Sequence, residues 1–509
     1  MRIPITINKN TLKTYNDYDT NKKIINTLQS NNLEEWDKEI PKNLQEICLE
    51  TIAKNWEAKP LLDEIPLTID QCLLLDILPT ELPLGLTIPK INDDIYWKRC
   101  YLQRWPKLIP ENVSLDIQIS EIVKVNNGSR KSSTTNSASS QRSRKSSQEQ
   151  QKSNKRTWKE CFLEMHLREY LEKLKPEDYD AEKIKELSDL CGIYVKILEL
   201  RELQSSENSP SRIPLNAIVT GLENLTELSI CFKQTYVGEK FSWNILKITL
   251  QDIKLLAKGL EKIHLKIFRL RNSDIDDEKM IRILKSLLKH DELHTLDFSH
   301  CKISDEGGVA LSKFCLLNSV NTLVLANNQI GTKGMEALSY VICQSACRLS
   351  TLDLKLNPIG NEGANHLMKP LTIGVRNIKN LYLSGCGIRH LPSLGEMIEH
   401  NSSLEQLNLS NNSLGEEMGK ILLQGLRYNT SLTKLDVRMC KLLSMDEFEI
   451  LRRINNNKLA KRCPRTMKKP IIIEPQYNFY ISEELLNEIE SAFEKIDENE
   501  EAVDEVEQT

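Results

Sequence analysis

The stretch "LNLSNNSLGEEMGKILLQGL", residues 407–426, contains the features that decide the fold of this chain. Leu407 and Leu409 alternate as in a short strand, whereas Ile421, Leu422 and Leu426 fall near helical spacing. Asn412 stands between these two patterns, at the place where the chain has to turn. A strand, an asparagine and a helix in such a short space predict one unit of a repeat.

Copies of the pattern L-x-x-L-x-L-x-x-N/C-x-L occur along the second half of the chain. Successive copies start 26 to 29 residues apart, and a degenerate copy, "LTELSICF", begins at Leu225. The clear copies begin at Leu265, Leu293, Val320, Leu349, Ile378, Leu404 and Leu432. This period is typical of leucine-rich repeats of the ribonuclease-inhibitor-like class. We therefore expect an α/β solenoid, with parallel strands inside and helices outside, after a mostly helical N-terminal region.

The ninth position of each copy carries an asparagine or a cysteine, except for Ser273 in the first copy. An asparagine amide can satisfy backbone groups of the turn that follows the strand, while a cysteine is a small, mostly apolar filler with a weak donor. We interpret these positions as structural turn residues of the repeat. They are Cys301, Asn328, Asn357, Cys386, Asn412 and Cys440.

The position between the two strand leucines should point away from the core, onto the concave face of the solenoid. Asp297, Asp353 and Asp436 occupy it in three copies, and Tyr382 and Asn408 occupy it in two others. The aspartates resemble a catalytic row, but each belongs to a different repeat. We interpret all five residues as solvent-facing positions of a partner-binding surface.

Catalytic and metal-binding signatures are absent from the sequence. It has no phosphate-binding G-x-x-x-x-G-K-[ST] loop and no G-x-S-x-G elbow. Cys343 and Cys347 lie four residues apart, but no second Cys/His pair completes a zinc site. We therefore expect no enzyme activity, no catalytic residue, no cofactor, no metal and no small-molecule substrate.

Composition narrows the partners and the compartment. The formal charge of −4 over 509 residues provides no general attraction for nucleic acid or membrane. No run of about 18 apolar residues is present, and the first residues lack the apolar core of a signal peptide. The 13 scattered cysteines are expected to be reduced thiols of a cytoplasmic protein.

The sequence divides into five segments by composition and pattern. They are a mostly helical region at 1–125, a Ser/Arg-rich linker at 126–157 that is too polar to fold, a helical flank at 158–224, the repeats at 225–458, and a C-terminal segment at 459–509. The last segment contains a short amphipathic helix and an acidic tail. We interpret it as solvated, while a cap on the solenoid end or a contact with a basic partner remain alternatives.

Two motifs outside the repeats indicate to which family of leucine-rich-repeat proteins the chain is similar. The chain contains "LPTELPLGLTIPKINDDIYWKRCYLQRW" (78–105) and "TWKECFLEMHLREYLE" (157–172), followed by the repeats. In this order they resemble the t-complex-associated testis-expressed family, which supplies the leucine-rich-repeat subunit, subunit 5, of the nexin–dynein regulatory complex. The residues that carry the resemblance are Leu82, Pro83, Leu84, Pro89, Tyr96, Trp97, Lys98, Arg99, Trp105, Trp158, Phe162 and His166.

The resemblance implies a scaffold in the cytoskeleton of motile cilia and sperm flagella. Its partners would be other subunits of the complex and proteins associated with the doublet microtubules of the axoneme. The insert at 126–157 departs from the family pattern and leaves the role of that segment unassigned.

Two other functions remain open on sequence alone. A GTPase-activating protein of the Ran type shares this repeat class and needs an exposed catalytic arginine, for which Arg389 and Arg438 are the candidates. A cytosolic binder like ribonuclease inhibitor would use the concave face, but the chain lacks the strongly acidic charge that a basic target favours.

Overall fold

The structure is a computed structural model that describes residues 43–110, 113, 156–206, 210–233, 247–373, 377–462 and 481–494. The chain forms two compact units, Met1–Pro106 and Lys107–Thr509. The expected disordered linker falls at 126–157, of which only Arg156 and Thr157 belong to the described residues. The acidic tail beyond Glu494 also lies outside them.

The described part of the first unit, residues 43–106, is helical. Its helices are α4 (Leu44–Lys54), α5 (Thr68–Ile77), α6 (Leu84–Lys90) and α7 (Asp94–Arg104), with a short 3-10 turn, η2 (Leu62–Glu64). Asp93 begins α7 by accepting hydrogen bonds from two backbone N–H groups of its first turn. Tyr96 and Trp97 are buried, and Trp97 Nε1 donates to the carbonyl of Ile91 at 2.9 Å. These two residues of the first flanking motif therefore belong to the core of this unit.

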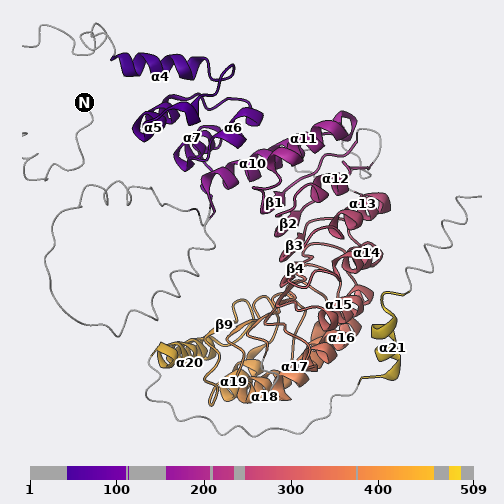
Figure 1. Cartoon of the computed structure of the whole chain (residues 1–509). Helices are drawn as coiled ribbons and strands as arrows, with labels where there is room; N and C mark the ends of the chain where they lie inside the picture. The colour runs from indigo at the N-terminus through magenta and orange to yellow at the C-terminus, as the bar shows by residue number, and fades with distance from the viewer. Residues whose placement is uncertain are drawn as a thin grey trace, which may run out of the picture. The chain divides into compact units, whose positions relative to one another are not determined.

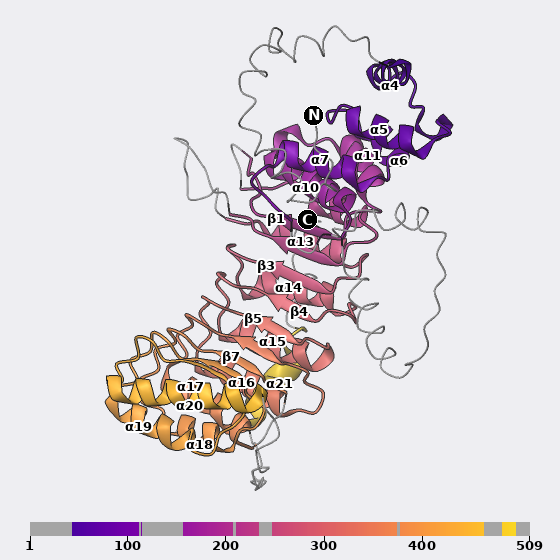
Figure 2. The same cartoon turned by 90° about the vertical axis from the view of Figure 1, so that its left-hand side faces the viewer.

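The second unit contains the solenoid, and its nine parallel strands follow one another in sequence order (Figures 1 and 2). The strands are β1 (Ile197–Leu200), β2 (Glu227–Ile230), β3 (Ile267–Leu270), β4 (Thr295–Asp297), β5 (Thr322–Val324), β6 (Thr351–Asp353), β7 (Asn380–Tyr382), β8 (Gln406–Asn408) and β9 (Lys434–Asp436). The sheet and the repeated strand–helix order confirm the expected leucine-rich-repeat fold.

Helices alternate with the strands. They are α10 (Trp158–Lys173), α11 (Ala181–Cys191), α12 (Leu215–Thr220), α13 (Leu250–Leu260), α14 (Asp277–Leu287), α15 (Asp305–Leu317), α16 (Thr332–Cys343), α17 (Gly360–Ile373), α18 (Ser393–His400), α19 (Glu416–Gly425), α20 (Ser444–Arg462) and α21 (Glu483–Ser491). A further 3-10 turn, η3, spans Pro176–Asp178. Neighbouring helices pack side by side, so the core lies between the helix layer and the inward leucines of the strands.

The sheet begins earlier than the sequence pattern indicates. The degenerate copy at Leu225 supplies the strand β2, and β1 lies inside the segment 158–224 that we expected to be helical. The expectation of a purely helical flank is therefore wrong. Val195, Leu198 and Leu200 supply the buried apolar columns of a repeat copy that lacks the ninth-position Asn or Cys. The buried carboxylate of Glu164 on α10 also accepts the backbone N–H groups of Lys196 and Ile197 at 3.3 and 3.0 Å.

A left-handed residue stands directly before every ninth position of the repeat. Each of these residues has a φ between 48° and 65°, which turns the chain sharply out of the strand. They are Asn272, His300, Asn327, Leu356, Gly385, Asn411 and Met439. Asparagine and glycine are the usual residues for this conformation, so Leu356 and Met439 hold it at a steric cost.

The asparagines of the ninth position tie each repeat to the one before it. Asn357 Oδ1 accepts the N–H of Ile330, and its Nδ2 donates to the carbonyls of Leu325 and Leu354. Asn328 and Asn412 make the same type of contacts. Cysteine at this position only donates: the thiol of Cys386 lies 3.2 Å from the carbonyl of Leu354. Burial raises the pKa of that thiol to about 12.

A second ladder of buried amides joins the helix ends to the strands, and the sequence pattern did not single it out. Asn401 Nδ2 donates to the carbonyl of Leu371, and its Oδ1 accepts the N–H groups of Ser403 and Leu404. Asn429 makes equivalent bonds one repeat later. His290 holds an earlier place in the ladder through both ring nitrogens, and burial lowers its pKa. The signal in the sequence was a polar residue placed two to three residues before four of the copies, at His290, Asn318, Asn401 and Asn429.

Candidate partner-binding site

The strand register brings the five expected concave residues into one row. Asp297 pairs with Val324, which pairs with Asp353, and the row continues through Tyr382 and Asn408 to Asp436. The preceding strand position, a buried leucine in each of these repeats, points to the opposite side of the sheet. The row therefore lies on the face of the sheet away from the helices.

The aspartates of the row are occupied by their own backbone. Each accepts the N–H of the residue two positions later: Asp297 from Ser299 at 2.9 Å, Asp353 from Lys355 at 3.2 Å and Asp436 from Arg438 at 3.2 Å. These contacts fix the chain as it leaves the strand. We expected all three carboxylates to reach solvent, and this is wrong for Asp297, whose residue is only 7% exposed. Its Oδ2 lies 3.8 Å from Arg271 Nε, and its turn contact is the one that all three aspartates share.

Basic residues pair with the other two aspartates. Lys355 Nζ lies 2.8 Å from Asp353 Oδ2 and 4.5 Å from the centre of the Tyr382 ring, so it connects two of the expected residues. Arg438 makes two hydrogen bonds to Asp436, at 2.9 and 2.7 Å, and they lower the pKa of that carboxyl. The row is thus a nearly neutral polar surface.

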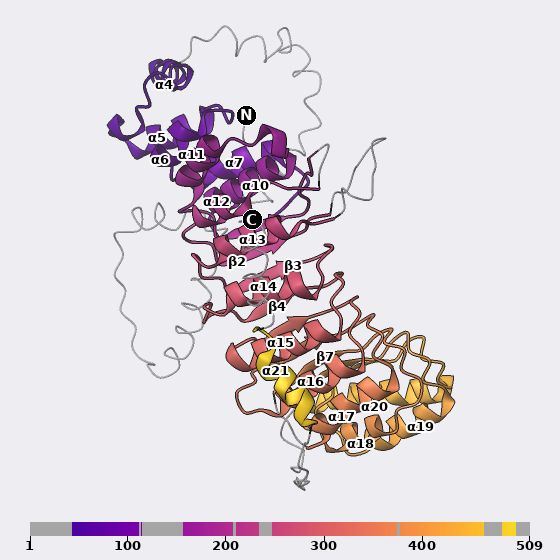
Figure 3. The ribbon, with the colours of Figure 1, turned by 90° about the vertical axis from the view of Figure 1, so that its right-hand side faces the viewer.

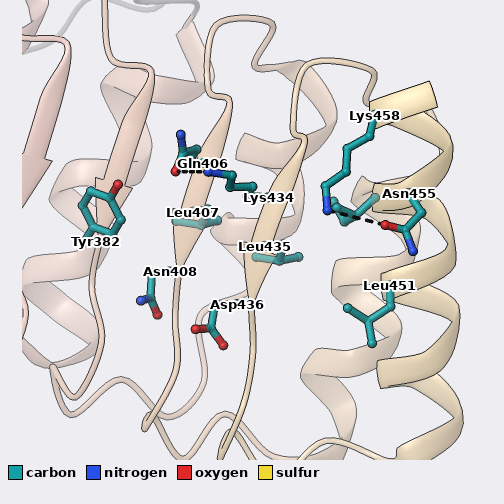
Figure 4. Close-up of a pocket in the computed structure, with 11 residues that line it drawn as sticks. Tyr382, Gln406, Leu407, Asn408, Lys434, Leu435, Asp436, Leu451, Asn455 and Lys458 are labelled. Atoms are coloured by element: carbon teal, nitrogen blue, oxygen red, sulfur yellow. Dashed lines mark hydrogen bonds between the residues drawn. The ribbon is translucent and has the colours of Figure 1, made fainter. Parts of the chain in front are cut away.

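A pocket of about 300 Å³ occupies the C-terminal end of this face (Figure 4). Three of the expected residues, Tyr382, Asn408 and Asp436, line it. Helix α20 forms its opposite wall, with Leu451, Asn455 and Lys458 turned toward the strands. The pattern of the repeats could not place this wall, because α20 follows the last strand and belongs to no further copy. Asp297 and Asp353 do not line the pocket.

Helix α20 also carries an exposed apolar stripe next to the pocket. Met445, Phe448, Leu451 and Leu459 are 52–80% exposed, whereas Ile450 and Ile454 on the opposite side of the helix are buried. Leu451 belongs to both the stripe and the pocket lining. The pocket has a mixed polar and apolar lining, and several large exposed apolar side chains lie on the same helix that walls it. Exposed apolar side chains gathered in this way are typical of protein-binding surfaces.

The described residues contain no group of three His, Cys, Asp or Glu side chains that could hold a metal ion. In the same ranges, no helix has both the length and the apolar character needed to cross a membrane. Two arginines were candidates for the catalytic residue of a GTPase-activating protein. Arg438 is paired with Asp436, and Arg389 is exposed, with its backbone N–H donating to the side chain of Asn361.

Family models of leucine-rich repeats match part of the repeat region. A family model described as "Leucine Rich repeat" matches residues 293–312, 317–339 and 347–367, and a second, "Leucine Rich Repeat", matches 403–425. Among solved structures, an internalin from Listeria monocytogenes covers 57% of this chain and 92% of its own, at 17% identity and a TM-score of 0.29.

Curated proteins named "Dynein regulatory complex subunit 5" are similar in sequence. The mouse protein is 30% identical over 302 residues, which are 55% of this chain and 52% of that protein. The human protein is 28% identical over the same shares, and the protein of Chlamydomonas reinhardtii is 27% identical over 47% of this chain and 49% of its own. The chain spans about half the length of the curated relatives it matches. The resemblance carried by the flanking motifs is thereby confirmed: this chain is a leucine-rich-repeat protein whose homologues are the proteins named dynein regulatory complex subunit 5.

Proposed function

We propose that this chain is a non-enzymatic subunit of the nexin–dynein regulatory complex, and that it regulates dynein-driven motility of cilia and sperm flagella by binding other proteins. The observation that carries the proposal is its similarity to proteins named dynein regulatory complex subunit 5 from animals and a green alga. Its place would be the axoneme, among other subunits of the complex and proteins on the doublet microtubules.

The fold suits such a role because a solenoid offers an extended, stiff surface. Strand pairing is continuous from β1 to β9, and the buried asparagines at the ninth position bond to the preceding repeat. A force applied to one repeat is therefore passed to the next without a flexible joint. A protein that links moving parts needs this property more than it needs a reactive group.

The pocket and the α20 stripe are the surface that we assign to a partner. Exposed apolar side chains on α20 would supply the buried centre of an interface, and Lys434 and Lys458 at the pocket would supply its polar rim. Tyr382, Asn408 and Asp436 would contact the same partner from the strands. An amphipathic helix is the partner element that best fits an apolar strip beside a polar wall.

The experiment is a binding assay on axonemes from cells that lack the subunit. A chain with Phe448→Glu and Leu451→Glu should lose retention, because both side chains are largely exposed and can be changed without opening the core. Leu317→Glu, at an exposed leucine of α15, is the matched control and should be retained like the wild type. Equal retention of all three chains would place the partner on another surface, and failure of the wild type to bind axonemes would remove the proposed function.

A further inference from the structure

Helix α21 does not extend into solvent: it lies against α15 and α16 on the outer side of the solenoid (Figure 3). Leu485 and Ile489 are buried there against Val309 of α15 and Ala337 of α16. Leu316 and Tyr340 pack around this cluster. The interpretation of the C-terminal helix as solvated is therefore wrong, and it does not cap the end of the sheet either. The apolar side of α21 packs on helices that are far away in the sequence: Lys333 and Glu488, which contact each other, are 155 residues apart.

Charge complements the apolar contact. Lys333 Nζ lies 2.7 Å from a carboxylate oxygen of Glu488. Lys313 donates a hydrogen bond to the backbone carbonyl of Glu490 and lies 5.1 Å from the centre of the Phe493 ring. An acidic helix thus rests on two lysines that flank the apolar cluster.

The receiving surface on α16 differs from the equivalent surface of the next helix, α17. The glycines Gly334 and Gly363 mark the same place in α16 and α17, so Ala337 corresponds to His366 and Tyr340 corresponds to Lys369. These two outward positions are apolar on α16, where α21 docks, and polar on α17. The repeat itself does not require this difference, because both helices bury the same inward columns.

We propose that Val309, Lys313, Lys333, Ala337 and Tyr340 form an outer helix site for acidic amphipathic helices, which α21 occupies within its own chain and from which an acidic helix of a partner displaces it. The proposal rests on contacts inside this chain and does not depend on the proposed function. Exchange is feasible because α21 has only nine residues. Isolated helices shorter than about 12–15 residues are marginal in water, so α21 is held mainly by these few side chains.

The test is a titration of the full chain with a fluorescent peptide of residues 480–495, read by anisotropy. The peptide stands for a competing helix. A chain with Leu485→Glu and Ile489→Glu cannot dock its own helix and should bind the peptide at least about tenfold more tightly than the wild type, because the tethered α21 competes at high effective concentration. Asn487→Glu changes an exposed position of the same helix and should behave like the wild type.

A charge swap makes the test specific. Glu488→Lys in the full chain weakens docking without placing a charge in the apolar cluster, so it should raise peptide binding in a chain whose core is untouched. Adding Lys333→Glu to the undocked chain should reduce binding of the natural peptide, and a peptide with Glu488→Lys should restore it.

Three results would overturn the proposal. The undocked chains fail to bind the peptide, the wild type binds it as tightly as they do, or sedimentation shows a dimer of the wild type that the chain with Leu485→Glu and Ile489→Glu does not form. Each of these outcomes leaves the axoneme assay unaffected, since its two test changes, Phe448→Glu and Leu451→Glu, lie on α20, and its control residue, Leu317 of α15, is exposed and does not belong to the apolar cluster under α21.

Discussion

Replacement of Asn412 by alanine tests the reasoning about the repeat most directly. Its Oδ1 accepts the N–H groups of Cys386 and Ile388 at 3.0 and 3.1 Å. Its Nδ2 donates to the carbonyls of Leu383 and Leu409 at 2.7 and 2.8 Å. The residue is only 1% exposed, so water cannot take over these contacts without a local opening of the turn.

The expected loss follows from the two orphaned N–H groups. A buried donor that loses its partner costs about 1–3 kcal/mol, which gives about 2–6 kcal/mol for the pair. Cys440 holds the same position one repeat later but only donates, to the carbonyl of Leu409 at 3.0 Å. Cys440→Ala should therefore cost about 1 kcal/mol, because no backbone donor loses an acceptor.

The assay is urea unfolding of the full chain followed by circular dichroism, with hydrogen exchange of the peptide that contains residues 385–391. Asn412→Ala should lower the unfolding midpoint clearly more than Cys440→Ala, and it should speed exchange at Cys386 and Ile388. Asn412→Asp keeps the acceptor and loses the donors. Its protection against hydrogen exchange should therefore be higher than that of Asn412→Ala and lower than that of Cys440→Ala. If Asn412→Ala and Cys440→Ala lose the same stability and exchange is unchanged, the amide does not hold the preceding repeat and the reasoning is refuted.

The remaining predictions concern strain, burial and pH. Leu356→Asn should raise the free energy of unfolding by about 0.5–1 kcal/mol, since this half-exposed residue has a φ of 56°; an unchanged or lower urea midpoint would contradict the strain argument. Leu354→Ala should lower the free energy of unfolding by about 2–5 kcal/mol, because it leaves a buried cavity. Asp353→Ala should lower it by about 1 kcal/mol, more than an ordinary surface change, because the Asp353 carboxylate holds Lys355. Equal losses of stability in the two variants would mean that the strand register is different. Burial raises the pKa of Glu164 to about 7, although Arg156 and two backbone N–H groups act to lower it. The folded state therefore binds this proton more tightly than the unfolded state does. The free energy of unfolding should fall by about 1–3 kcal/mol as the pH rises from about 5 to 7.5. In Glu164→Gln this loss of stability with rising pH should be smaller. If Glu164→Gln and the wild type have the same pH profile of thermal unfolding, other groups cause the loss.

Much of the solenoid could be predicted from the sequence, because the information for it is local. Alternating leucines specify each strand, the residue at the ninth position specifies the turn, and a constant period requires that the units stack. The row through Asp353, Tyr382, Asn408 and Asp436 followed from this spacing, since parallel strands in register place equal positions side by side. The similarity to dynein regulatory complex subunit 5 was likewise visible in short motifs around Trp97 and Trp158.

Only the tertiary structure decided which of these positions remain accessible and what surrounds them. Asp297 fits the exposed column of the pattern, yet it is buried, whereas Asp353 and Asp436, which make the same turn contact, are only partly buried. The strand β1 has the apolar columns of a repeat copy at Val195, Leu198 and Leu200 but no Asn or Cys at the ninth position, and Glu164 and β2 satisfy its backbone. The wall that α20 builds beside β9 and the docking of α21 on α15 and α16 join segments that no period relates. Such contacts depend on where the folded solenoid places its surfaces in space, and a pattern that repeats along the chain carries no information about that.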